Sequence, residues 1–143
     1  MTYAATTKVP IEQTRNEIER TLARYGAKRF AYFTEAGRAI VVVFEANDRR
    51  IRFDLPVPEG DSDKENQGRR QKWRALLLCI KAKLESVESK IESFETAFLG
   101  HIVLPNGRTV AEEIQPSIAT AYSEGKMLPL LPDYSARKKD GLH

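Results

Sequence analysis

The stretch from Arg69 to Leu99 contains neither glycine nor proline, and its large apolar residues recur at a regular spacing. Successive members lie four and then three residues apart, the a/d pattern of long amphipathic helices. The pattern predicts one helix of about 30 residues, which would be ~45 Å long. Such a helix needs either the rest of the chain or a second copy packed along it. The predicted oligomer seam is Trp73, Leu77, Ile80, Leu84, Val87, Ile91 and Phe94, and Phe98 continues its spacing.

The residues before this stretch predict a helix followed by a sheet. Apolar residues share one face over 11–25, between Pro10, which suits a first helical turn, and Gly26, which suits a helix end. Three runs rich in aromatic and β-branched residues follow, and the middle run is apolar on both faces. We therefore expect an antiparallel three-stranded meander with strands at 30–33, 39–44 and 51–55, and turns at Glu35–Gly37 and Asn47–Asp48.

The remaining segments complete an α+β domain over 1–134, followed by a flexible basic tail at 135–143. Two prolines end the sheet, and the polar residues 59–68 predict a loop or linker within 56–68. After the long helix, the sequence fits either a small hairpin around Asn106-Gly107 or a helix capped by Thr109 and Glu112. We expect Pro116 to break that helix, Gly125 to end it, and residues 127–132 to strap across the core in extended form.

Composition excludes several classes of protein. The chain is 41% hydrophobic and 30% charged, as in globular proteins, and it has no apolar run long enough to span a membrane. The first residues do not resemble a secretory signal. The single cysteine, Cys79, excludes an internal disulfide and a cysteine-rich zinc site, and we expect it to be a buried thiol. These features predict a cytoplasmic protein.

Charge is distributed unevenly along the predicted long helix. Bases dominate its first half, whereas Glu85, Glu88, Glu92 and Glu95 lie in its second half. This order opposes the helix macrodipole, so an anion such as phosphate, or acids from another element or subunit, would compensate at the basic end. The alternative is a solvated face, with acids of the preceding linker as counter-ions. The basic residues concerned are Arg69, Arg70, Lys72 and Arg74.

A second basic group lies at the turn before the third strand and along that strand. Arg49, Arg50 and Arg52 would lie near Arg38 and near Tyr32 or Phe33 in the sheet. Arginines interleaved with aromatic rings on a sheet are typical of single-stranded nucleic-acid binding. The alternative is that the rings belong to the core and the arginines protect a sheet edge.

Motifs for catalysis are absent from the sequence. It contains no phosphate-binding glycine loop, no His-Glu-x-x-His and no nucleophile elbow. The acidic residues of the long helix lack the histidines of a carboxylate-bridged metal site, and His101 has no orienting carboxylate nearby in sequence. We therefore expect a non-enzymatic protein without cofactor or metal.

Five segments resemble an uncharacterised family of small proteins encoded by tailed phages and prophages. They cover most of the chain, at 10–27, 52–58, 73–85, 104–110 and 125–132. The resemblance implies a location in the host-cell cytoplasm and a role in DNA replication or recombination, or in counter-defence. It implies no particular activity.

Two functional hypotheses follow. The first is a homo-oligomeric accessory protein that binds single- or double-stranded nucleic acid through the phosphates. Its candidate contacts are Arg69, Arg70, Lys72, Arg74, Arg50 and Arg52. The alternative is a counter-defence protein that binds a host immune protein or sequesters a nucleotide signal. A plain assembly module without an anionic ligand is a third possibility.

Overall fold

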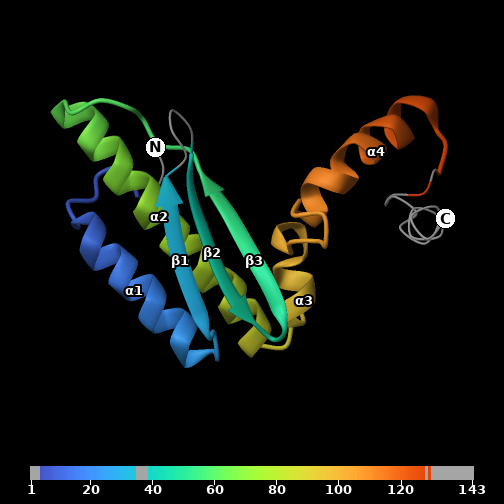
Figure 1. Cartoon of the computed structure of the whole chain (residues 1–143), viewed down its shortest axis with the longest axis horizontal. Coiled ribbons are helices and arrows are strands. Elements are labelled where there is room, and N and C mark those ends of the chain that lie inside the picture. Colours follow the sequence, from blue (N-terminus) through green and yellow to red (C-terminus); the bar gives the residue numbers. More distant parts are fainter. Residues whose placement is uncertain (1–3, 35–38, 128, 130–143) are drawn as a thin grey trace, which may run out of the picture.

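The computed structural model describes residues 4–34, 39–127 and 129 (Figure 1). It confirms the α+β class. The predicted turn at Glu35–Gly37, most of the predicted strap at 127–132 and the tail at 135–143 lie outside the described residues. The elements in chain order are α1 (Ile11–Arg24), β1 (Arg29–Thr34), β2 (Ile40–Ala46), β3 (Arg49–Leu55), α2 (Asp63–Glu88), α3 (Phe94–Ala97), the 3-10 turn η1 (Leu99–His101) and α4 (Val110–Glu124).

The first helix and the meander confirm the predictions closely. The sheet has the order β1-β2-β3, with both neighbouring pairs antiparallel and the apolar strand β2 in the centre. Asn47 and Asp48 both have positive φ, at 53° and 60°, as a tight two-residue hairpin turn requires. This turn fixes the register of β3, so that Ile51, Phe53 and Leu55 are buried.

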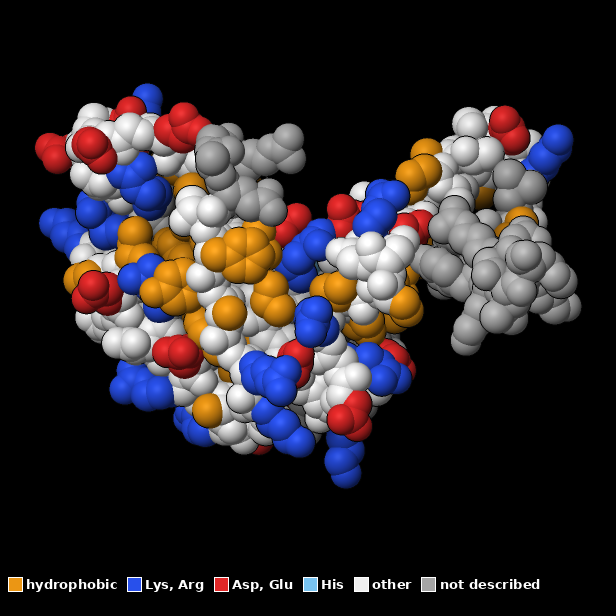
Figure 2. Space-filling view, viewed as in Figure 1, with side chains coloured by type: hydrophobic (Ala, Val, Ile, Leu, Met, Phe, Trp, Pro, Cys, Tyr) orange, Lys and Arg blue, Asp and Glu red, His pale blue; other side chains and the backbone are white. Residues whose placement is uncertain are grey.

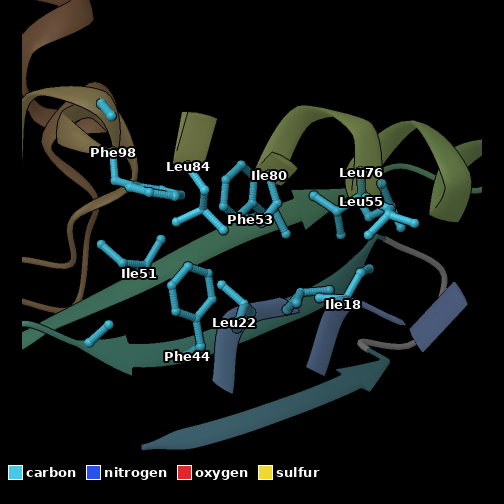
Figure 3. Close-up of a cluster of buried hydrophobic side chains, with 14 of the residues drawn as sticks. Ile18, Leu22, Phe44, Ile51, Phe53, Leu55, Leu76, Ile80, Leu84 and Phe98 are labelled. Atoms are coloured by element: carbon cyan, nitrogen blue, oxygen red, sulfur yellow. The ribbon is translucent and has the colours of Figure 1, made fainter. Parts of the chain in front are cut away.

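Helices α1 and α2 cover one face of the sheet. In Figure 1 the sheet lies in front of α2, and Figure 3 shows the side chains that meet between strands and helices. The contributing side chains alternate along β2 and β3 and recur at helical spacing in α1 and α2. The largest fully buried members are Trp73, Phe44, Phe98, Ile18, Leu22, Ile51, Leu77, Ile80, Leu84 and Val42.

The prediction of a linker over 59–68 is wrong from Asp63 onward, where α2 begins. The Ser62 hydroxyl accepts the Glu65 N–H at 3.3 Å and caps the helix. Gln67, one turn later, donates to the carbonyls of Ala5 and Thr7 at 3.2 and 2.6 Å. The polar residues therefore cap the helix and bind the N-terminal segment, which their composition alone does not reveal.

The prediction of one helix through Leu99 is also wrong, because α2 ends at Glu88. Lys90 adopts a left-handed conformation with φ of 61°, and the N–H groups of Ile91 and Glu92 both donate to the Ser86 carbonyl. This is the helix-ending arrangement that glycine usually provides. Ser93 then caps the short helix α3 by accepting the Thr96 N–H at 3.0 Å. The chain thereby turns back and inserts Phe98 into the core.

The predicted oligomer seam is thus divided between the chain's own core and its surface. Trp73, Leu77, Ile80 and Leu84 are at most 1% exposed and pack under the sheet. Val87 and Phe94 are half-buried against the same core, whereas Ile91 is 77% exposed in the turn after α2. Of the two possibilities for the long helix, packing by the rest of the chain is the one observed, so the buried side chains are not available to a second copy.

Replacing Lys90 by glycine is expected to raise the free energy of unfolding by about 0.5–1 kcal/mol. The left-handed backbone conformation costs a residue with a Cβ roughly 1–2 kcal/mol, and glycine avoids this cost. The greater conformational freedom of glycine in the unfolded chain takes back roughly 0.5–1 kcal/mol of that stabilisation. Urea denaturation of Lys90→Gly beside Lys90→Ala, which keeps the Cβ, measures the effect. A glycine variant less stable than the alanine variant would contradict it.

After η1 the chain crosses back to the sheet and then leaves it. The Val103 N–H donates to the Arg50 carbonyl at 2.8 Å, and Ile102 forms a single bridge with Ile51 of β3. The hairpin expected around Asn106-Gly107 is reduced to one bridge, Val103 with Thr109. The predicted capping box of Thr109 and Glu112 is confirmed, and Gly125 ends α4 in a left-handed conformation.

Pro116 does not break α4, contrary to the prediction. Proline cannot donate to the carbonyl four residues earlier, that of Glu112. The Arg108 guanidinium donates to this carbonyl instead, at 3.3 Å, so the lost hydrogen bond is replaced. Among the helices of the described residues, none combines the length and apolar character needed to cross a membrane.

Candidate nucleic-acid interface

Arg69, the first residue of the predicted phosphate site, holds the chain segment that precedes α2. Its guanidinium donates to the carbonyls of Pro58 and Gly60 at 2.8 and 2.6 Å, and it also donates to the Asn66 side chain. Gly68 allows this close packing, because a Cβ there would lie 2.8 Å from Pro58 Cγ. Arg69 therefore holds the segment before α2 in place. The N–H groups that it uses for this are the ones that would otherwise bind a phosphate.

The other three predicted residues do not converge on one site. Arg70 donates twice to the Gln67 side chain, at 3.1 and 2.7 Å. Arg74 donates to Glu17 of α1 at 3.0 Å, and this hydrogen bond is the main reason why the pKa of the Glu17 carboxyl lies below its usual value. Lys72 is exposed and forms no hydrogen bond or ion pair within the described part of the chain.

The charge order that pointed to an anion at the start of the long helix has a simpler origin. Because α2 begins at Asp63, its first turn contains Asp63 and Glu65, which complement the helix macrodipole. Arg69 to Arg74 lie in later turns, away from the free N–H groups of the helix start. The prediction of a basic helix N-terminus is therefore wrong, because the first turn of α2 is acidic.

The face of the sheet opposite α1 and α2 is the better candidate. Side chains alternate along each strand, so the residues between the buried ones point away from the helices. The strand register places these residues in three rows across the sheet. The rows are Phe33–Val41–Asp54, Ala31–Val43–Arg52 and Arg29–Glu45–Arg50. We call these nine residues the open face; Figure 2 shows apolar side chains over the sheet with basic ones around them.

The apolar part of the open face centres on an aromatic ring. Phe33 is 49% exposed, beside the exposed Ala31 and the half-buried Val43, whereas Val41 next to it is only 7% exposed. Tyr32, the other predicted aromatic, points to the helices, where its ring packs edge-on against Trp73 at 5.8 Å and under the Arg15 guanidinium at 4.3 Å. Of the two rings, Phe33 alone therefore lies on the open face. Arg38 lies outside the described residues.

The basic part of the open face has two exposed guanidiniums that share one carboxylate. Arg29 of β1 and Arg50 of β3 lie on either side of Glu45 of β2, with N···O distances of 3.5 and 3.2 Å. Their side chains are 78% and 58% exposed. Ion pairs this exposed contribute only about 0–1 kcal/mol. The three side chains carry a net charge of +1, so a phosphate would find two available donors here.

Arg52, in contrast, is fixed. Its guanidinium donates to the Gly107 carbonyl at 3.0 Å, lies 3.2 Å from Asp54 and pairs with Glu112 of α4. Only 20% of this side chain is exposed. Arg52 therefore attaches α4 to the sheet, and it is not free to bind a phosphate.

A hollow of about 530 Å³ continues the open face at its Arg50 end. It lies between the β2–β3 turn and the loop before α4. Arg49 lies at its edge and forms an ion pair with Glu95 at 2.8 Å, and this pairing raises the pKa of Arg49. The lining residues are Glu45, Asp48, Arg49, Arg50, Val103, Leu104, Pro105 and Gly107.

The remaining chemically reactive side chains do not form a second site. Cys79 is exposed, so the expected buried thiol is wrong. The His101 ring stacks on Phe53 at 4.0 Å, with Nδ1 3.1 Å from the Arg52 carbonyl, and burial lowers the pKa of the imidazole. Within the described residues, no group of three His, Cys, Asp or Glu side chains is placed to hold a metal ion.

Comparison with known proteins gave no match. No protein-family model fits the chain, and neither a curated protein nor a solved structure is significantly similar to it. The open face is therefore the main structural guide to function. Arg29 is the residue that sequence reasoning missed, although strand alternation with Ala31 and Phe33 would have placed it there.

Proposed function

We propose that the protein is a non-enzymatic nucleic-acid-binding protein that holds a single strand on its open face. The observation that carries the proposal is the half-exposed ring of Phe33 on the same sheet face as Arg29 and Arg50, opposite α1 and α2. A base would stack on the ring while the two guanidiniums bind phosphates. The proposed contacts are to the flat face of a base and to phosphates, so we expect little sequence preference.

The spacing along β1 supports simultaneous contacts. Phe33 and Arg29 lie four residues apart on one strand, which is ~13 Å at about 3.3 Å per residue. The distance is enough for a base at one end of the face and a phosphate at the other. Replacing the Glu45 carboxylate by a phosphate as the partner of both arginines costs little free energy, because both ion pairs are exposed to water.

Fluorescence anisotropy with a labelled oligothymidine at several salt concentrations tests the proposal. Phe33→Ala is expected to weaken binding by ~5- to 150-fold, the equivalent of ~1–3 kcal/mol for one stacked base. The double variant Arg29→Gln/Arg50→Gln is expected to reduce the slope of log affinity against log salt by ~1.4, at ~0.7 for each phosphate contact.

A matched control separates the open face from overall charge. Arg20→Gln/Arg24→Gln removes the same charge from exposed positions on α1, in the helix layer. We expect this control to bind like the unmodified protein. No binding at low salt, or equal losses in both double variants, would refute the proposal. Thermal stabilisation by a nucleotide, with no strand binding, would favour the counter-defence alternative instead.

A further inference from the structure

The hollow at the Arg50 end of the open face lies where a bound strand would continue. Glu45 and Arg50 belong both to the open face and to the lining of the hollow. A strand with a phosphate on Arg29 and Arg50 would therefore bring a neighbouring base to the hollow. Its volume of about 530 Å³ is larger than a single base, so a base can enter without any movement of the chain.

One side of the hollow is an apolar wall. It consists of the half-buried Val103 and Leu104 and the exposed Pro105, in the loop between η1 and α4. The Val103 N–H donates to the Arg50 carbonyl at 2.8 Å, and the Gly107 N–H donates to the Leu104 carbonyl at the same distance. These hydrogen bonds hold the wall beside β3. Apolar side chains of this kind usually cover the flat faces of ring-shaped ligands.

The lining of the hollow also includes a carboxylate that has no partner. Asp48 is exposed in the β2–β3 turn, and among the described residues its side chain forms no hydrogen bond or ion pair. The other carboxylate of the lining, Glu45, is already paired with two arginines of the open face. Arg49 is held by Glu95 at 2.8 Å and by the Asp48 carbonyl at 3.2 Å. Asp48 therefore offers two acceptor oxygens to a ligand.

A carboxylate distinguishes the bases by the donors on their pairing edges, which are exposed in a single strand. Guanine has two adjacent donors there, the ring N1–H and the amino group, and they can reach both oxygens of one carboxylate together. Adenine and cytosine offer the amino group beside a ring nitrogen whose lone pair repels a carboxylate. Thymine offers one ring N–H between two carbonyl groups. An unpartnered carboxylate therefore favours guanine.

We propose that the hollow binds one guanine of the strand, with the Asp48 carboxylate accepting from its N1–H and its amino group. The wall of Val103, Leu104 and Pro105 covers a face of the base. This guanine site rests on the proposed function, because the phosphate contacts of Arg29 and Arg50 bring the strand to it. It adds a preference at one position to contacts that are otherwise independent of sequence.

Fluorescence anisotropy with two labelled oligonucleotides tests the guanine site. One is a short oligothymidine, and the other has a single guanine at its centre. We expect ~5- to 30-fold tighter binding of the second, the lower part of the range for one bidentate base contact, because the hollow is open to water. Equal affinity for the two would overturn the guanine site and leave the proposed function intact. Binding of neither would contradict both.

Two altered bases identify the edge of guanine that is bound. Hypoxanthine lacks the amino group, so an oligonucleotide with hypoxanthine in place of guanine should lose most of the gain in affinity. A guanine analogue with carbon in place of N7 lacks an acceptor that an arginine would use. It keeps both donors, so it should bind as tightly as guanine. The opposite result for the two bases would assign the preference to arginine and overturn the role of Asp48.

Asp48→Asn tests the carboxylate itself. Asparagine tolerates the left-handed conformation of this turn position, so the hairpin is kept, which circular dichroism verifies. Its amide has one acceptor oxygen and no charge, so the affinity ratio of the two oligonucleotides should fall close to one. Asp61→Asn is the matched control, because it removes the same charge from an exposed position in the loop after the far end of β3. The full ratio in Asp48→Asn, or its loss in Asp61→Asn, would overturn the guanine site.

Discussion

Replacing Phe98 by alanine is expected to destabilise the protein by about 3–5 kcal/mol, the usual cost of deleting a buried aromatic side chain. Phe98 is fully buried, and its ring lies 4.7 Å from Phe94, 5.8 Å from Phe44 and 6.5 Å from Phe53. It closes the end of the core beyond α2, next to Leu84 (Figure 3). Urea denaturation followed by tryptophan fluorescence measures the loss.

Ile91→Ala is the matched control, because Ile91 and Phe98 occupy equivalent positions in the apolar spacing that predicts one long helix. Ile91 is 77% exposed, so its truncation should change the free energy of unfolding by less than about 0.5 kcal/mol. A continuous helix with a covered seam would make both substitutions costly. Similar losses in the two variants would therefore contradict the turn at Lys90.

The apolar spacing could not distinguish these two arrangements. It requires only that Trp73, Leu77, Ile80 and Leu84 face one direction, which they do toward the sheet. The helix ends at a lysine in a left-handed conformation, where the usual glycine signal is missing. The helix ends there because of a tertiary contact: the turn lets Phe98 pack against Phe44 and Phe53 of the sheet. The strands, in contrast, were predictable because alternation and the Asn47–Asp48 turn are local signals.

The basic residues were found by sequence, but their partners were not. Arg74 pairs with Glu17, 57 residues away, and Arg52 pairs with Glu112, 60 residues away. Arg69 binds backbone carbonyls, for which no sequence signal exists. A count of charges along one helix therefore overestimates the cations available to a ligand. That Arg29 and Arg50 share one carboxylate became visible only through the strand register, which places both beside Glu45.

Replacing Glu112 by alanine is expected to release α4 from the sheet at a cost of about 1–3 kcal/mol, because several donors lose their acceptor together. The Glu112 carboxylate accepts from the Thr109 N–H at 2.9 Å, from the Thr109 hydroxyl at 3.1 Å and from Arg52. Hydrogen exchange of the α4 amides measures the effect, since α4 can separate while the sheet remains folded. Unchanged protection of α4 in Glu112→Ala would contradict this role.

Glu112→Gln separates the capping box from the charge, because glutamine can still accept from Thr109 but cannot form the ion pair. The hydrogen bond from the Thr109 N–H is the main cause that lowers the pKa of the Glu112 carboxyl; the Thr109 hydroxyl and Arg52 add to it, and partial burial opposes it. A carboxyl with a lowered folded pKa stabilises fully above its unfolded pKa of about 4.3. That contribution disappears as the pH falls through the folded value. The protection lost in Glu112→Gln should therefore be largest at neutral pH and vanish in acid. A difference that persists in acid would assign the effect to packing instead of charge.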